Sequence, residues 1–339
     1  MVLGLYAAYK YGKRVSRRSR RRSSNSTGDG LELVLALFYL AFLAAKASYY
    51  VSLSIVKAIR FTFRVMKICF LSFQIFMTSF KKNLQKEGII KMKQNEEIKR
   101  VLQKYPIGAP IVKNSTPVVS FGNPNTAMVA TLGINPSSQE FLDRKGNVLD
   151  LANKRLVDLD SLNKSSLNDL DEDDAKKIID GCYNYFKTGN HYKWFDPIEE
   201  YVLKPSGFSY FDNSACHLDV IQWATDPVWS NIKSKEIQDM LLEKDQDFLK
   251  YQLSNYHFET IFLNGKTVIN QVEKLGIVKL TDVAEVVNLK NGNTSLIKVG
   301  QVGMTKFVGW TMNIPAKETS KKVREALAEW LRQKNYESK

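Results

Sequence analysis

The chain has 339 residues, 44% of them hydrophobic, which is enough for one large domain or two ordinary domains with a buried core. Its net charge of +14 is uneven, because residues 1–105 carry 21 of the 49 Lys and Arg residues but only 5 of the 35 Asp and Glu residues. The rest of the chain is close to neutral, so the basic charge is only modest evidence for nucleic-acid binding. Three scattered cysteines favour a reducing compartment, indicate neither a disulfide framework nor a zinc site, and are too few for an iron–sulfur cluster held by four cysteines.

Residues 1–30 are predicted to form a basic arm rich in Arg and Ser. Eight Lys and Arg residues lie between Lys10 and Arg22, and no acidic residue precedes Thr27. This composition cannot build a core. It is typical of an organelle transit peptide, of a basic arm on DNA, or of the cytoplasmic flank of a membrane segment.

Residues 31–105 are predicted to form an apolar and then amphipathic helical segment. Leu33–Val56 contains a single charge, Lys46, and is long enough to span a bilayer. From Lys46 onward, cations spaced 11, 3, 4 and 3 residues apart fall within about 80° of one another on a helix. Residues 31–80 are therefore expected either to associate with an anionic membrane, spanning it or lying on it, or to form a soluble helical appendage. The expected location is cytoplasmic, at the inner face of a membrane if the segment is attached to one.

A globular domain is predicted over residues 106–339, where short apolar runs alternate with turns. Pro117–Phe121 is a strand candidate, and Met128–Leu132 is a second strand that breaks into a polar turn at Gly133. In an open α/β sheet such turns line the ligand crevice, so Asn135 is expected to face the ligand. Pro136 would fix the turn, and Gly133 would allow a close approach of the backbone.

The middle of this domain is expected to contain two helices and one further strand. Five acids within residues 169–174 predict the start of a capped helix, and a second helix is expected from about Ile198 to Leu203. On the strand around Cys216, His217 and Asp219 share one face and Cys216 lies on the other, so a Cys–His catalytic dyad is not expected. His217 and Asp219 either contact the pocket or form an internal pair.

The last third of the chain repeats the order of strand, turn and helix. Glu259–Val268 is predicted to begin as a strand that ends near Asn264, turn at Gly265 and continue into a helix through Lys274. A hairpin is expected from two strands, residues 284–289 and 295–302, joined by residues 290–294. A final strand, residues 306–312, breaks at Asn313 before a helix over residues 320–333. The amino terminus of this helix would offer a phosphate site together with Lys317, Lys321 and Lys322.

Gly133-Ile134-Asn135-Pro136 resembles the first active-site motif of the uracil-DNA glycosylase superfamily, and most closely the Gly-Ile-Asn-Pro-Gly of its mismatch-specific thymine/uracil branch. Asn313-Ile314-Pro315-Ala316 occupies the place of the second motif, His-Pro-Ser or Asn-Pro-Ser, but a residue is inserted before the proline and no serine follows it. Four segments in the order of the superfamily cover most of residues 117–333.

The resemblance implies an α/β fold, a three-layer α/β/α sandwich around a parallel four-stranded sheet. It also implies that Asn135 and Asn313 are catalytic residues on loops at one edge of that sheet. Phe141 would either stack on the extracted base or lie in the core, and Asn264 would either read the base or cap the following helix. The other residues expected to contact substrate are Gly133, Ile134, Pro136, Ser137, His217 and Asp219.

The implied activity is that of a monofunctional DNA glycosylase that needs no metal and no cofactor. Its partner would be DNA, and its substrate a flipped uracil, mismatched thymine or modified pyrimidine, in DNA repair or in defence against foreign DNA. Two alternatives stay open. In one, the domain is a catalytically silent, membrane-tethered nucleic-acid-binding module. In the other, it is a metal-dependent hydrolase built on His217 and Asp219, whose activity a chelator would remove.

Overall fold

The structure is a computed structural model that describes residues 29–287 and 294–337. The basic arm up to residue 28 lies outside the described residues, as do residues 288–293, which hold the end of the first strand of the expected hairpin and most of its turn. The chain divides into two compact units, residues 1–87 and 88–339. The described part of the first unit is the front of helix α2 (Asp29–Val101), whose side chains from Val34 to Phe80 are almost all exposed.

The second unit is an α/β domain that begins earlier than the sequence analysis places it, because it includes residues 88–101 of α2. Arg100 and Asp245 form an ion pair of 2.8 Å in which both side chains are at most 1% exposed. Glu97 is also buried and accepts hydrogen bonds from the hydroxyls of Tyr183 and Tyr256. These contacts make the last turns of α2 part of the domain core.

The domain is built on a mixed six-stranded sheet, whereas the sequence analysis predicts four parallel strands. The strand order is β2-β1-β3-β6-β5-β4. Strands β1 (Val129–Gly133), β2 (Ala215–Asp219), β3 (Thr260–Asn264) and β6 (Thr305–Trp310) pair in parallel. The expected hairpin is present as β4 (Thr281–Val287) and β5 (Thr294–Val302), and β5 pairs antiparallel with β6. The hairpin therefore extends the sheet beyond its last parallel strand, where it satisfies backbone groups of β6.

The prediction of a strand at Pro117–Phe121 is wrong. The segment is extended, but it joins the sheet region through a single bridge between Phe121 and His217. The Val118 amide donates instead to the carbonyl of Gln222, 2.8 Å away. The carbonyl of Val119 accepts from the Gln252 side chain of α6 (Lys235–Asn255), so the segment does not continue the ladder.

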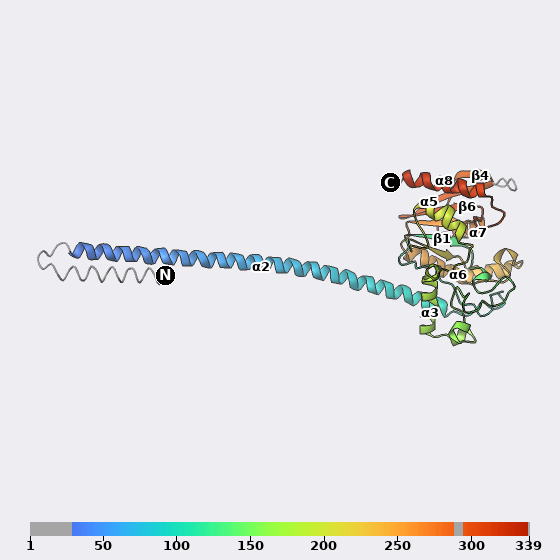
Figure 1. Ribbon diagram of the computed structural model, residues 1–339, viewed down its shortest axis with the longest axis horizontal. Coiled ribbons are helices and arrows are strands. Elements are labelled where there is room, and N and C mark those ends of the chain that lie inside the picture. Colours follow the sequence, from blue (N-terminus) through green and yellow to red (C-terminus); the bar gives the residue numbers. More distant parts are fainter. Residues whose placement is uncertain (1–28, 288–293, 338–339) are drawn as a thin grey trace. The chain divides into compact units, whose positions relative to one another are not determined.

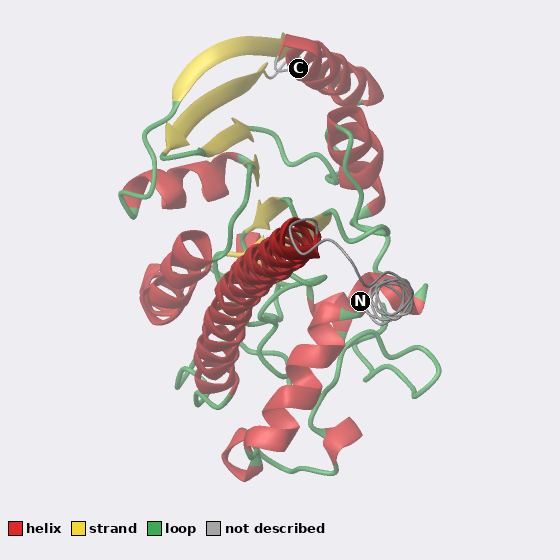
Figure 2. Cartoon of the chain, turned by 90° about the vertical axis from the view of Figure 1, so that its left-hand side faces the viewer, coloured by secondary structure: helices red, strands yellow, loops and turns green. Residues whose placement is uncertain are grey.

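Helices pack around the sheet (Figures 1 and 2). Helix α7 (Lys266–Lys274) contacts β3 and β6, and α8 (Lys321–Glu337) contacts β4 and the short helix α5 (Lys204–Ser206). The helix predicted from Ile198 is a continuous helical stretch from α4 (Asp196–Ile198) through a π-helical turn (Glu199–Leu203) into α5. The acidic run caps α3 (Glu172–Tyr183) as predicted, with Asp171 and Asp174 forming a capping box, and α6 (Lys235–Asn255) precedes β3.

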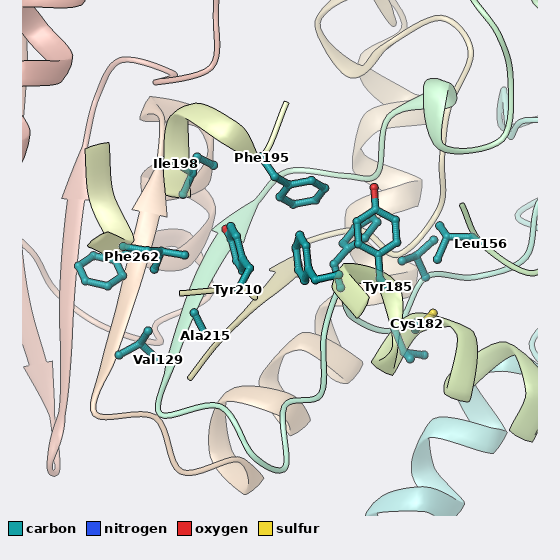
Figure 3. Packing of buried hydrophobic residues seen from close by; sticks show 14 of the residues in the cluster. Val129, Leu156, Cys182, Tyr185, Phe195, Ile198, Tyr210, Ala215 and Phe262 are labelled. Atoms are coloured by element: carbon teal, nitrogen blue, oxygen red, sulfur yellow. The ribbon is translucent and has the colours of Figure 1, made fainter. Parts of the chain in front are cut away.

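An apolar core lies on each face of the parallel strands, because successive side chains of a strand point to opposite faces. Val129, Ala215 and Phe262 belong to the first core, which Figure 3 shows together with rings such as Phe195 and Tyr210. Leu132 and Leu218 belong to the second core. The strands are therefore buried on both sides, as in sheets covered by helices on both faces.

Candidate functional site

The carboxyl ends of the four parallel strands meet at one edge of the sheet. Asp219 is the last residue of β2, Asn264 is the last residue of β3, Asn135 follows β1 by two residues, and Asn313 follows β6 by three. Strands β1 and β6 are separated only by β3, so the two loops start about 10 Å apart. The structure thus brings the two expected catalytic amides to the same edge.

Asn135 is held in one orientation by three acceptors. Its half-buried side-chain nitrogen, Nδ2, donates to the carbonyls of Pro136 and Trp223 at 3.1 and 3.2 Å, and lies 3.0 Å from the Thr225 hydroxyl. A flipped amide would place its oxygen against two carbonyl oxygens, which is unfavourable. The group left for a ligand is Oδ1, for which the described residues supply no hydrogen-bond partner. Asn135 therefore presents an acceptor.

In Asn313 the side-chain oxygen is the atom bonded within the protein, whereas in Asn135 it is the nitrogen. Asn264 fixes this orientation of Asn313. Asn264 Oδ1 accepts from the Trp310 indole and from the Ile314 amide, both at 3.0 Å. Asn264 Nδ2 must therefore be the donor in its 2.8 Å bond to Asn313 Oδ1. The side-chain nitrogen of Asn313 is left to donate outward from an exposed residue.

This network gives Asn264 a different role from either one expected from the sequence. Its side chain is 6% exposed and its oxygen is already used twice, so it cannot offer both a donor and an acceptor to a base. It does not cap α7 either, because the residue at that cap is Gly265, where the chain turns with φ +101° and no side-chain cap is made. Asn264 connects the end of β3 to the loop that carries Asn313.

His217 and Asp219 lie on one face of β2 as predicted, and both are buried, at 1% and 4% exposure. His217 Nε2 is 3.4 Å from an Asp219 oxygen, and its Nδ1 lies 2.7 Å from the Thr131 hydroxyl. An added Cβ at Gly133 would lie 2.6 Å from Asp219 Oδ1 and 2.8 Å from His217 Nε2. The structure therefore shows an internal pair, and Gly133 leaves the space that this pair occupies.

A buried carboxyl beside this pair was not recognised in the sequence. Glu140 is 2% exposed, and one of its oxygens accepts a 2.7 Å hydrogen bond from the Tyr185 hydroxyl. Burial raises the pKa of Glu140 to about 8; the Tyr185 hydrogen bond and the Arg155 charge oppose this rise, and Asp219 adds to it. Glu140 is then mostly protonated at neutral pH. The position of Glu140 four residues after Pro136 could have marked it as a candidate site residue. The sequence does not show that it is buried.

The other residues of the first motif have mainly structural contacts. Phe141 is 4% exposed and belongs to the first apolar core, so in this structure it is a core residue with no ring face open for stacking. Ser137 caps a short helical turn, where its hydroxyl accepts from the Gln139 amide. Pro136 is buried, and Ile134 is half-buried and packs against the second core. Of this motif, the Asn135 side chain keeps a polar atom, Oδ1, to which the described residues supply no hydrogen bond.

The loop from Asn313 to α8 is braced by residues that the sequence analysis did not single out. Arg324 donates to the carbonyls of Ile314 and Ala316, and the Thr319 hydroxyl donates to the carbonyl of Asn313. The three lysines expected to bind phosphate, Lys317, Lys321 and Lys322, are exposed near the start of α8, and Lys321 is 3.4 Å from Glu325.

In the described part of the chain, no group of three or more His, Cys, Asp and Glu residues is placed to hold a metal ion. Cys216 is buried in the second core, and burial raises the pKa of its thiol well above the ordinary range. It is therefore a neutral core residue rather than a nucleophile.

Comparison with known proteins adds no relative: no family model matches the chain, and a search of curated proteins finds no match. The proposal below therefore depends on the motif and on the geometry of the sheet edge.

Proposed function

We propose that this protein is a monofunctional DNA glycosylase that hydrolyses the N-glycosidic bond of a flipped pyrimidine nucleotide. The observation that carries the proposal is the pair of amides at one sheet edge, with an acceptor presented by Asn135 and a donor presented by Asn313. This pair agrees with the resemblance to the uracil-DNA glycosylase superfamily. The apolar cores on both faces of the sheet are compatible with the three-layer sandwich of that superfamily.

The two amides suit the two ends of the bond that breaks. Hydrolysis adds a water oxygen to the anomeric carbon, while the electrons of the carbon–nitrogen bond leave with the base. Asn135 Oδ1 would accept a hydrogen bond from this water and orient it. The outward nitrogen of Asn313 would donate to the oxygen on which the departing base builds negative charge. The base takes up one proton, and the water releases one to solvent.

The rate of such a site has a chemical limit. An amide oxygen orients water but does not take its proton as a carboxylate does. We therefore expect slow and selective catalysis. Lys317, Lys321 and Lys322 would hold the DNA backbone, and Asn264 would act through Asn313 as a positioning residue.

The test is a panel of oligonucleotides that contain uracil, mismatched thymine or modified pyrimidines, in single and double strands. Each is incubated with the full chain and then treated with alkali, which cleaves the abasic sites that a glycosylase leaves. We expect cleavage for at least one base, and its loss in Asn135→Ala with fold and DNA binding retained. Asn255→Ala is the matched control, because Asn255 is exposed on α6 and bonds only to Tyr251 of its own helix.

Full activity of Asn135→Ala would refute the mechanism. DNA binding without abasic sites for every base would favour the second candidate, a catalytically silent nucleic-acid-binding module. Two observations favour that candidate: the altered second motif, Asn-Ile-Pro-Ala, and the burial of Phe141 away from any base.

A further inference from the structure

Helix α2 carries an unusually large exposed apolar surface. Residues 34–80 form a stretch of 47 residues. Its most apolar part has a mean hydropathy of 1.6, and none of that part is buried. Large exposed side chains extend along it, for example Phe38, Phe61, Phe70 and Phe76, each at least 60% exposed. Patches of this size on soluble proteins mark interaction surfaces.

The charged residues of this stretch are all positive and all lie on one side of the helix. No acidic residue occurs between residues 33 and 86. Its five cations, Lys46, Lys57, Arg60, Arg64 and Lys67, fall within about 80° of arc at 100° per residue, and all are exposed. We call these five residues the basic stripe. The basic stripe is complementary to an anionic surface, and the apolar remainder is complementary to lipid chains.

The spacing of the cations disfavours a helix that crosses the bilayer, although the stretch is long and apolar enough to do so. A helix of 47 residues is about 70 Å long, whereas the hydrocarbon layer is about 30 Å thick and needs about 20 apolar residues. Within residues 34–80, the stretches without a cation are residues 34–45, 47–56 and 68–80, each of 13 residues or fewer. Every span of about 20 residues within this stretch would therefore place a Lys or Arg of the basic stripe within the hydrocarbon, and a span that begins early enough to avoid them would include Glu32.

We propose that residues 46–80 lie in the plane of an anionic lipid bilayer, with the basic stripe among the headgroups and the opposite face in the acyl chains. This placement satisfies all five cations at once and removes exposed rings of the opposite face, such as Phe73 and Phe76, from water. It does not depend on the catalytic proposal. It would keep the domain beside a membrane surface.

Binding is tested by flotation of the full chain with vesicles of phosphatidylcholine alone, or with about 30% phosphatidylserine. We expect binding to the anionic vesicles at least tenfold tighter, and weaker in high salt because screening reduces the attraction. The triple charge reversal Lys57→Glu, Arg60→Glu and Arg64→Glu should remove this preference. The matched control reverses three exposed lysines of the domain, Lys187, Lys250 and Lys279, and should bind as the wild type does. Equal affinity for both vesicles would overturn the proposal.

Orientation is tested with the native cysteines. Cys69 is exposed while Cys182 and Cys216 are buried, so a thiol-reactive spin label should modify Cys69 in the folded protein. On the helix Cys69 lies about 160° from the centre of the basic stripe, so its label should sit deep in the acyl chains. A label at Arg64→Cys in a Cys69→Ser chain should sit at headgroup depth.

The two arrangements predict different depth profiles along the helix. Spin labels are placed one at a time from residue 61 to residue 72, and the depth of each in the bilayer is measured. If the helix lies in the plane of the bilayer, this depth should rise and fall along the sequence with a period of about 3.6 residues. A depth that changes steadily along the helix would show a spanning segment and overturn the proposal. Labels that are shielded from both water and lipid would show a bundle of α2 helices and would overturn it as well.

Discussion

The buried carboxyl of Glu140 should make the stability of this domain depend on pH in the direction opposite to that of an acid whose pKa is lowered on folding. Burial raises its pKa from 4.5 to about 8. Between these two pH values the folded chain holds a proton that the unfolded chain has lost, so stability falls as pH rises. At about 1.4 kcal/mol per pKa unit, the full loss above pH 8 is about 5 kcal/mol. That is a large part of the usual 5 to 15 kcal/mol for a protein domain.

Glu140→Gln removes this titration and keeps the shape of the side chain. We expect the free energy of unfolding of the variant, relative to wild type, to rise by up to about 5 kcal/mol between pH 5 and pH 9. The assay is urea unfolding at several pH values, followed by tryptophan fluorescence. All five tryptophans lie between Trp194 and Trp330, so the signal reports on the domain alone.

Comparing the two proteins isolates Glu140 from other buried acids. Burial also raises the pKa of Glu97 and of Asp245, and both groups are present in both proteins. Glu200→Gln is the matched control, because Glu200 is 58% exposed and should leave the wild-type curve unchanged. Parallel curves for wild type and Glu140→Gln would refute the reasoning.

Two further substitutions test the packing that positions the site. Gly133→Ala places a methyl group within 2.8 Å of polar atoms of Asp219 and His217, so it should destabilise the domain by about 1 to 3 kcal/mol and lower its melting temperature. Arg100→Met leaves the buried carboxylate of Asp245 without its ion-pair partner, and chemical denaturation should show a loss of about 3 to 5 kcal/mol.

Each of these substitutions has a matched control on α2. Gly88→Ala meets no atom within 4 Å and should be neutral or slightly stabilising, since alanine favours helix. Lys99→Met removes a cation whose side chain is 69% exposed, and should change the free energy of unfolding by less than about 1 kcal/mol. If Gly133→Ala were as stable as Gly88→Ala, the close contact assigned to Gly133 would be incorrect. Equal stability of Arg100→Met and Lys99→Met would show that the last turns of α2 are not held by the buried ion pair.

The sequence by itself determined the features that depend on neighbouring residues. The run before Gly133 is apolar enough to form a buried strand, and it does so as β1, while Asp171 and Asp174 cap α3 as predicted. The polar residues that follow strands were also predictable. The resemblance to the uracil-DNA glycosylase superfamily implied that Asn135 and Asn313 share one edge, and they do because the parallel strands β1 and β6 end there.

Only the tertiary structure decided the roles that depend on distant partners. Arg100 meets Asp245 145 residues further along the chain, so the sequence analysis placed the end of α2 outside the domain. Asn264 could have read a base or capped a helix, but its hydrogen bonds with Trp310 and Asn313 make it a link between the end of β3 and the loop that carries Asn313. Phe141 and Glu140 are neighbours in the sequence and both are buried. Burial by segments far away is what makes one a core ring and gives the other its raised pKa, and local patterns do not contain that information.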